Sequence, residues 1–308
     1  MDRELDVFSN YRSITNKIKK RFLKKPNFNE ASEQFATLTR VLKHQECAQY
    51  AGFCCLAKAR CENTLGNCVA EAEALLEAAR LFFQAEKVNI DAKCAALDEH
   101  LPEAIHCYNQ AVKGYSKEGR HAQASIVALE LAQNLLSIGR ADEAHNHFVR
   151  AAEMQRKTSI MDSLCTLRKA AYCQFYLNNL PGALTHLSEV MEMISSMVAQ
   201  DANSLTYTLQ SIRQSVEITF VFIMLLLKSS PMELSNEHSK VMETYTWENE
   251  EENNRVLPED LFLLIQSVVM ATNAKDVDTL TYLQVELYPQ LDTVQCELFQ
   301  KIIHETNE

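Results

Sequence analysis

A short motif recurs through the middle of the chain, and its spacing limits the fold more than any other feature. Leu101-Pro-Glu-Ala104, Ala141-Asp-Glu-Ala144 and Leu180-Pro-Gly-Ala183 begin 40 and 39 residues apart. After the Ala that closes each motif, apolar residues follow at the fourth and seventh positions, namely Tyr108, Ala111, Phe148, Ala151, Leu187 and Val190. Positions four and seven apart share one face of a helix. The chain is therefore expected to repeat one helix-turn-helix unit.

The stretch Ala122–Met154 shows this unit most clearly. Apolar residues recur at three- and four-residue steps before Gly139 and again after it. Gly139 supplies the left-handed residue that ends the first helix, and Asp142 and Glu143 favour the positive N-terminus of the second. Small alanines where the helices cross allow their axes to approach closely. Because a tetratricopeptide unit is roughly 34 residues long, each helix here is expected to be about one turn longer.

Composition agrees with an all-helical chain. Its 308 residues include only six Gly and six Pro, and alternating apolar and polar runs are almost absent. We predict an all-α, tetratricopeptide-like α-solenoid of about fourteen antiparallel helices. Three regions are expected: an N-terminal basic amphipathic helix (1–28), helical repeats (29–199), and C-terminal helices continuous with the solenoid (200–308), which include an acidic loop at 248–257.

The charge distribution excludes a nucleic-acid binder. The formal net charge is −11, although the first 25 residues carry eight basic and three acidic side chains, so the remainder is more acidic still. Nucleic-acid binding would require the opposite balance. The ten cysteines and the absence of a signal peptide favour reduced thiols in a cytosolic protein.

The basic segment at residues 5–25 is the first candidate interaction surface. Tyr11, Ile14, Ile18 and Phe22 share one helix face with cationic side chains around it, and Pro26 ends the segment. Three interpretations are open: a solvated charge run beside an apolar seam, docking on an acidic partner or acidic lipid, and a nuclear-import signal. The candidate binding residues are Lys19, Lys20, Arg21 and Phe22.

The C-terminal region contains two further candidates. Residues 203–228 are expected to form one long helix, apolar on all sides from 218 to 227, and these ten residues are too few to span a membrane. The second candidate is Trp247–Leu264, where an aromatic residue, an acidic loop and an apolar helix adjoin. Trp247 and Leu261 could instead cap the end of the array. The candidate residues in the two segments are Phe220, Phe222, Trp247, Glu250, Glu251, Glu252, Leu261 and Phe262.

No pattern indicates catalysis, a cofactor or a metal. Gly114-x4-Gly119 is followed by Arg120-His121, where a phosphate loop requires Lys-Ser/Thr. Cys47, Cys54, Cys61 and Cys68 are spaced by seven, so on one helix successive thiols would lie about 10 Å apart, too far to share a zinc ion. We interpret them as small packing residues, with a reactive or metal-binding cluster as the alternative. His145, His147, Glu71 and Glu73 are interpreted as ordinary helix-surface or partly buried residues. We therefore expect a protein that is not an enzyme.

Five segments resemble one known family. They are Tyr11–Asn27, Glu30–Cys47, Glu77–Phe82, Tyr245–Asp276 and Leu283–Leu291. In sequence and order they are similar to the forty-kilodalton huntingtin-associated proteins, also called factor VIII intron 22 proteins. The resemblance covers both ends and the repeat core, and the two end segments are long and unusual.

The resemblance implies a solenoid related in style to soluble NSF attachment proteins. It implies a subunit that lies between the HEAT-repeat domains of huntingtin, in a heterodimer rather than a homo-oligomer, each partner stabilising the other. It also implies a role in early endosome traffic as an effector of a Rab5-type GTPase. The family's acidic C-terminal part faces a basic surface of huntingtin, and the matching stretch here is Glu248–Asp260.

One departure limits what the resemblance implies. Members of the family carry an Ala/Gly-rich leader and a long Pro-rich insertion before the C-terminal helices, where this chain has only Ala199–Ser204. The leading hypothesis is a non-enzymatic scaffold subunit that binds huntingtin. The alternative is a free trafficking adaptor that docks on a small GTPase or an acidic membrane through Tyr11–Lys25. The expected locations are the cytoplasm, the nucleus and early endosomes.

Overall fold

The computed structural model describes residues 7–19, 26–94, 98–200, 207–227, 241–245 and 256–307, and every regular element in these ranges is a helix. Fourteen helices are described, of which η4 (Tyr288–Gln290) is a short 3-10 turn. The predicted all-α solenoid class is confirmed. The chain forms two compact units, Met1–Ser163 and Leu164–Glu308.

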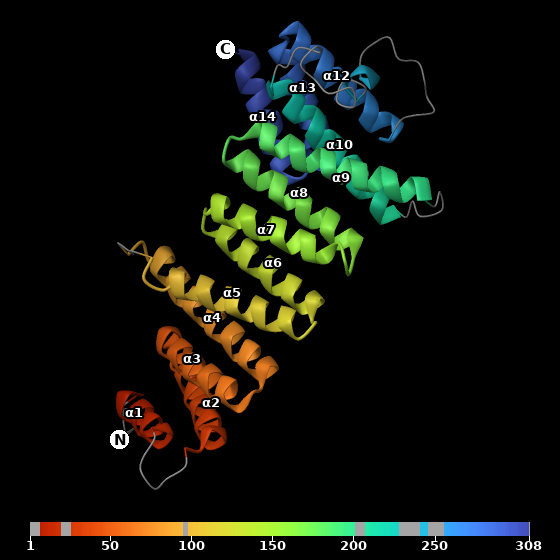
Figure 1. Ribbon diagram of the computed structural model, residues 1–308. Helices are drawn as coiled ribbons and strands as arrows, with labels where there is room; N and C mark the ends of the chain where they lie inside the picture. Colours follow the sequence, from red (N-terminus) through yellow and green to blue (C-terminus); the bar gives the residue numbers. More distant parts are fainter. Residues whose placement is uncertain are drawn as a thin grey trace. The chain divides into compact units, whose positions relative to one another are not determined.

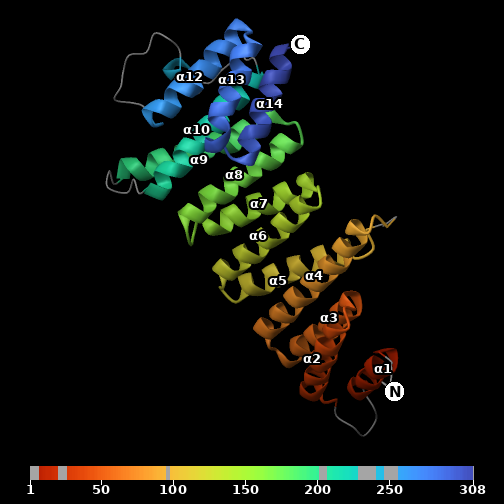
Figure 2. The ribbon, with the colours of Figure 1, turned by 180° about the vertical axis from the view of Figure 1, so that it is seen from behind.

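The first unit is a series of helices in which each packs against the next along the chain (Figures 1 and 2). Its helices are α1 (Val7–Ile18), α2 (Phe28–His44), α3 (Ala48–Leu65), α4 (Cys68–Asp91), α5 (Leu101–Lys117), α6 (His121–Ser137) and α7 (Ala141–Gln155). Their positions match the predicted repeats. The 40-residue period therefore corresponds to a helix pair such as α6 and α7.

The repeat positions identified in the sequence lie in the cores of the two units. Each of the nine side chains is fully buried: Ala104, Tyr108, Ala111, Ala144, Phe148, Ala151, Ala183, Leu187 and Val190. Alanine at the point of closest approach leaves room for the backbone of the neighbouring helix, and the larger residue one turn later fills the space beside it.

The turn between α6 and α7 has the predicted left-handed residue. Gly139 adopts φ 81°, the Gly139 amide donates to the Leu136 carbonyl at 3.0 Å, and the Arg140 amide donates to the Leu135 carbonyl at 3.0 Å. These bonds satisfy carbonyls that the end of α6 would otherwise leave without a partner. Asn178, at φ 58°, takes the same place after α8 (Ile160–Tyr176).

A polar cluster joins α4, α5 and α6. Arg80 donates two hydrogen bonds to the Glu130 carboxylate, at 2.7 and 2.6 Å. The Tyr108 hydroxyl donates to Glu130 at 2.8 Å and accepts from the Asn134 amide at 3.0 Å. Burial alone would raise the pKa of Glu130, but the Arg80 and Tyr108 hydrogen bonds outweigh burial and lower it. These charge-assisted hydrogen bonds give the three helices a specific polar contact beside their apolar packing.

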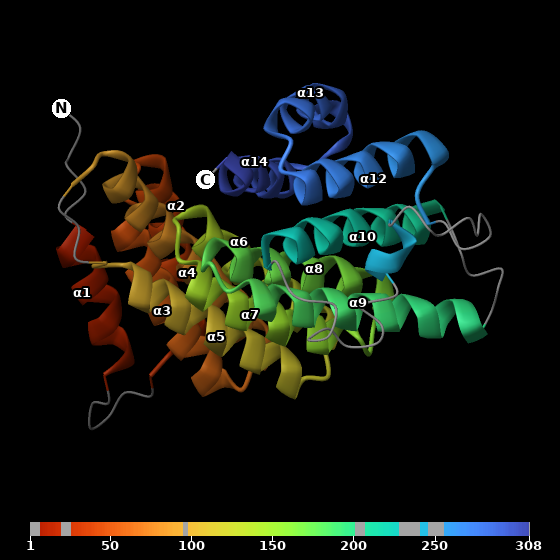
Figure 3. The same cartoon turned by 90° about the horizontal axis from the view of Figure 1, so that it is seen from above.

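The second unit surrounds one apolar helix, α10 (Tyr207–Leu227). It also contains most of α8, together with α9 (Leu180–Gln200), α12 (Glu259–Ala274), α13 (Val277–Leu287) and α14 (Thr293–Asn307). Helices α9, α12 and α14 all contact α10 (Figure 3), which confirms that an all-round apolar helix needs cover on more than one side. The Phe222 and Phe299 rings stack with centroids 5.5 Å apart.

The boundary between the units lies inside α8, whereas the sequence pattern suggested a change of region near residue 200. The reason is that α8 bonds to the C-terminal helices: Arg168 donates to the Ser215 hydroxyl at 2.9 Å, and the Tyr172 hydroxyl donates to Asp292 at 2.7 Å. The repeat pattern therefore continues past the point where the packing partners change.

Helix α10 is close to the predicted long helix at residues 203–228, and its apolar part is buried as expected. The ten-residue apolar run is part of a 21-residue helix that is long and apolar enough to span a membrane by length and composition. However, 72% of its apolar window is buried inside the unit. A buried core helix passes the same test, so length and composition are weak support for a membrane span.

Helix α1 ends at Ile18 and is followed by Lys19, and the rest of the predicted basic helix, residues 20–25, lies outside the described residues.

We expect Ala144→Leu to lower the free energy of unfolding by about 1 to 3 kcal/mol, because Ala144 is fully buried and a larger side chain overpacks the helix crossing. The measurement is urea denaturation followed by circular dichroism. Ala122→Leu, at an exposed position of α6, is the matched control and should change little. Equal stability of the two variants would contradict the helix pairing.

Candidate partner-binding surfaces

The predicted basic surface is partly described. Helix α1 attaches to α2 through buried Ile14, through the Tyr11 and Phe35 rings at 5.4 Å, and through a Lys17–Glu30 ion pair at 3.1 Å. Lys19 is exposed just beyond the helix. The predicted contact residues Lys20, Arg21 and Phe22 lie outside the described residues. Of the predicted apolar seam, Ile14 is thus buried and Tyr11 and Ile18 are half-buried, and Lys19 is exposed.

Three aromatic residues predicted to contact a partner are instead buried in the second unit. Phe220 and Phe222 are fully buried in α10. Phe262 is buried in α12, where its ring stacks on Tyr245 with centroids 5.0 Å apart. The prediction missed this because an all-round apolar helix can be covered by its own chain or by a partner, and the sequence does not distinguish the two. These side chains stabilise the unit and offer no surface.

The acidic run has well-defined anchors on either side. The Tyr245 hydroxyl donates to the Glu217 carboxylate of α10 at 2.6 Å, and both side chains are buried. One turn earlier on α10, the Gln214 amide donates to the Val256 carbonyl at 3.1 Å. The predicted residues Trp247, Glu250, Glu251 and Glu252 lie between these anchors and outside the described residues. Leu261, on α12, is half-buried, which is compatible with either interpretation of that residue.

The structure shows one apolar surface in the second unit that sequence reasoning missed. On α13, Tyr282 and Val285 are 70% and 71% exposed, while Leu280, Leu283 and Leu287 on its other side are buried. The sequence of α13 has apolar residues on two faces of one short helix, and a search for a single apolar stripe does not separate the two faces.

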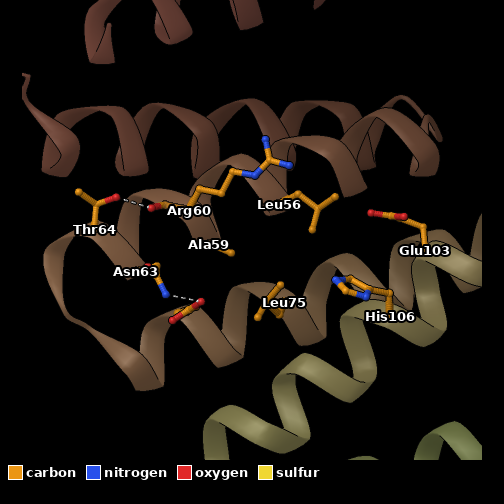
Figure 4. Close-up of a pocket in the computed structure, with 9 residues that line it drawn as sticks. Leu56, Ala59, Arg60, Asn63, Thr64, Leu75, Glu103 and His106 are labelled. Atoms are coloured by element: carbon orange, nitrogen blue, oxygen red, sulfur yellow. Dashed lines mark hydrogen bonds between the residues drawn. The ribbon is translucent and has the colours of Figure 1, made fainter. Parts of the chain in front are cut away.

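A polar groove lies in the first unit where α3, α4 and α5 meet (Figure 4). Its volume is about 370 Å³, and it is lined by Leu56, Ala59, Arg60, Asn63, Thr64, Glu71, Leu75, Glu103 and His106. The Asn63 amide donates to the Glu71 carboxylate at 2.7 Å, which ties α3 to α4. Glu103 and His106 are exposed, and among the described contacts no hydrogen bond joins them. The groove therefore contains both cationic and anionic side chains. Among its described hydrogen bonds, none joins a general base to a nucleophile.

The chain is similar to known proteins over most of its length. Residues 17–212 match the sequence model of the family described as soluble NSF attachment protein, SNAP. Two proteins called 40-kDa huntingtin-associated protein, from Rattus norvegicus and Mus musculus, are each 34% identical to this chain over 98% of its length and 93% of theirs. The chain belongs to this huntingtin-associated family.

The related proteins were expected to carry segments that this chain lacks. The alignment to the rat protein spans 357 residues, which exceeds the 308 of this chain. The relatives therefore carry segments without a counterpart here. A solved structure, "Crystal Structure of Rap Protein Complexed with Competence and Sporulation Factor", matches with a TM-score of 0.41 and 12% identity over 99% of this chain and 81% of that chain. Similarity at this level establishes no shared fold.

The cysteines that the sequence spaces by seven differ in burial. All ten cysteines are free. Of the four spaced by seven, Cys54 and Cys61 are buried in α3, whereas Cys47 is half-buried and Cys68 is exposed, so burial fits the packing interpretation for two of the four. Burial raises the pKa of Cys54 to about 11 and that of Cys55 to about 12. The thiolate is the nucleophile and metal ligand, so thiols held protonated at neutral pH are poor at both roles. Gly66 ends α3 before Cys68, as expected.

The two histidines of α7 are partly buried, as the sequence suggested. Burial lowers the pKa of both His145 and His147. In the part of the chain that the structure describes, no three His, Cys, Asp or Glu side chains gather closely enough to hold a metal ion.

We expect Tyr245→Phe to lower stability by about 2 kcal/mol at pH 7, because a buried Glu217 carboxylate then loses its donor. Tyr282→Phe, at an exposed tyrosine, is the matched control. Equal losses from the two substitutions, measured by urea denaturation, would show that Tyr245 is no anchor.

The same pair has a defined pH dependence. Burial raises the pKa of Glu217 above its ordinary value of 4.5, although the Tyr245 hydrogen bond and Arg213 oppose this effect. The folded chain therefore holds this proton more tightly than the unfolded chain, and its stability falls as the pH rises from the unfolded pKa through the folded one. Glu217→Gln should remove this part of the pH dependence, as measured by melting temperatures from pH 4 to 8.

Proposed function

We propose that this chain is a non-enzymatic scaffold subunit that binds and stabilises huntingtin. The observation that carries the proposal is the 34% identity, over 98% of the chain, to two proteins whose names state an association with huntingtin. An all-helical stack without a bonded catalytic set among its described side chains fits this role, because such folds present extended surfaces to other chains.

The proposed partner contact combines a rigid fold with a charged surface. The core of α10 and the Glu130 cluster hold the helices in place, so little ordering has to occur on binding. The acidic residues Glu250, Glu251 and Glu252 would orient a basic surface of huntingtin, since charge complementarity governs orientation and association rate. We propose a heterodimer rather than a homo-oligomer.

We expect huntingtin from the same organism to co-purify with this chain at moderate salt. Glu250, Glu251, Glu252→Gln should slow association and make it less dependent on salt, as measured by surface plasmon resonance at two salt concentrations. Glu33, Glu46, Glu118→Gln removes the same charge from exposed positions of the first unit and should have little effect. Failure of huntingtin to co-purify would overturn the proposal.

A second function is favoured by the basic N-terminal segment and by the attachment-protein family match. In this alternative the free chain is a trafficking adaptor that docks on an acidic membrane or a Rab5-type GTPase through Tyr11–Lys25. Lys19 is exposed, and the described residues from Val7 to Lys19 carry three basic and no acidic side chains. The proposed locations are the cytoplasm, early endosomes and the nucleus.

Lys19, Lys20, Arg21→Glu should abolish binding to anionic vesicles in a sedimentation assay if the segment docks on membranes. The control, Lys87, Lys113, Lys117→Glu, makes the same charge change at exposed positions elsewhere in the first unit. Binding that survives the first substitution would remove the membrane form of this alternative.

A further inference from the structure

An apolar groove lies between α1 and α3 in the first unit. Val7, Phe8 and Tyr11 form the α1 side, and Tyr50, Phe53 and Cys54 form the α3 side. The groove has a volume of about 270 Å³. The Phe8 and Tyr50 rings meet edge to face with centroids 5.6 Å apart, and the Phe53 ring meets Phe82 in the same way at 5.1 Å. The walls are thus built from aromatic rings that other rings hold in place.

These rings are unusually accessible for their size. Phe8 is 70% exposed, Phe53 is 46% exposed and Tyr50 is 36% exposed. Single exposed apolar residues are ordinary, but three large rings that line one groove form a contiguous apolar surface, which is typical of a binding site. Aromatic side chains in a groove also supply much of the affinity at protein interfaces.

Each wall helix of the groove carries an exposed arginine. Arg12 follows Phe8 by four residues on α1, and Arg60 follows Phe53 by seven on α3, so helical spacing places each arginine on the same face as an aromatic wall residue. Both arginines are exposed. On the two wall helices as described, the one carboxylate is Glu62, which is buried against Ser32 and Asn67. The groove therefore has an apolar lining, and the exposed charges of its two described wall helices are basic.

We propose that this groove binds an acidic amphipathic helix of another polypeptide. The apolar residues of that helix, at positions i, i+4 and i+7, would fill the space between the Phe8 and Phe53 rings, and its flanking Glu or Asp side chains would pair with Arg12 and Arg60. A recessed space with ring walls fits inserted side chains better than it fits a flat lipid surface. The assignment goes beyond the huntingtin proposal, because it concerns a described surface at the other end of the sequence from the acidic run.

The test uses the full chain and a fluorescein-labelled synthetic helical peptide with Leu and Phe at i, i+4 and i+7 and Glu elsewhere. The control peptide has Lys in place of every Glu. We expect the acidic peptide to bind, with fluorescence anisotropy reporting an affinity at least about tenfold above that of the basic peptide. Phe8→Ser should weaken binding roughly tenfold or more, and Arg60→Glu should shift the preference toward the basic peptide.

Ile126→Ser is the matched control, because Ile126 is an exposed apolar residue on α6. It should leave the peptide affinity unchanged, and circular dichroism should show that all variants fold alike. Equal affinity for the two peptides, or unaltered binding by Phe8→Ser, would overturn the proposal. So would binding to anionic vesicles through the same residues without binding of either peptide. Co-purification of huntingtin should be unchanged by Phe8→Ser, so the two proposals fail independently.

Discussion

Close approach of helices at buried alanines is the constraint on which the repeat packing depends. Ala104, Ala144 and Ala183 occupy equivalent places at the start of three helices, and none is accessible to solvent. A larger residue there would separate the helices and open voids along the stack, because protein interiors tolerate little change in volume. The 40-residue period is thus a packing requirement as well as a sequence pattern.

The second unit is packed differently, because it is built around the apolar helix α10. Helix α10 is buried on all sides along its second half, and its few polar groups are bonded. Glu217 accepts from Tyr245, and Gln295 of α14 donates to Thr219 at 3.1 Å and to the Ser215 carbonyl at 2.9 Å. Since buried polar groups are costly unless bonded, these pairs specify which segments lie against α10. The chain on either side of the acidic run is held in this way.

Each unit leaves an apolar surface accessible to solvent. The first unit leaves an aromatic groove whose two described wall helices carry exposed basic side chains, and the second leaves an apolar stripe on α13. Neither surface contributes much to its own core, so stability does not require large apolar side chains there. Accessible apolar surfaces of this kind are typical of sites that bind other chains.

The sequence by itself determined the helical class, the period, the turn at Gly139 and the family, because these depend on local spacing and on long matching segments. It also located most helix boundaries, since Gly, Asn and Pro act within a few residues of where they stand. Only the tertiary structure decided which apolar side chains are buried. All five of the following residues are phenylalanines on helices. Phe220, Phe222 and Phe262 are covered by their own unit, whereas Phe8 and Phe53 are accessible. Burial depends on which helices pack together, and periodicity along one helix does not contain that information.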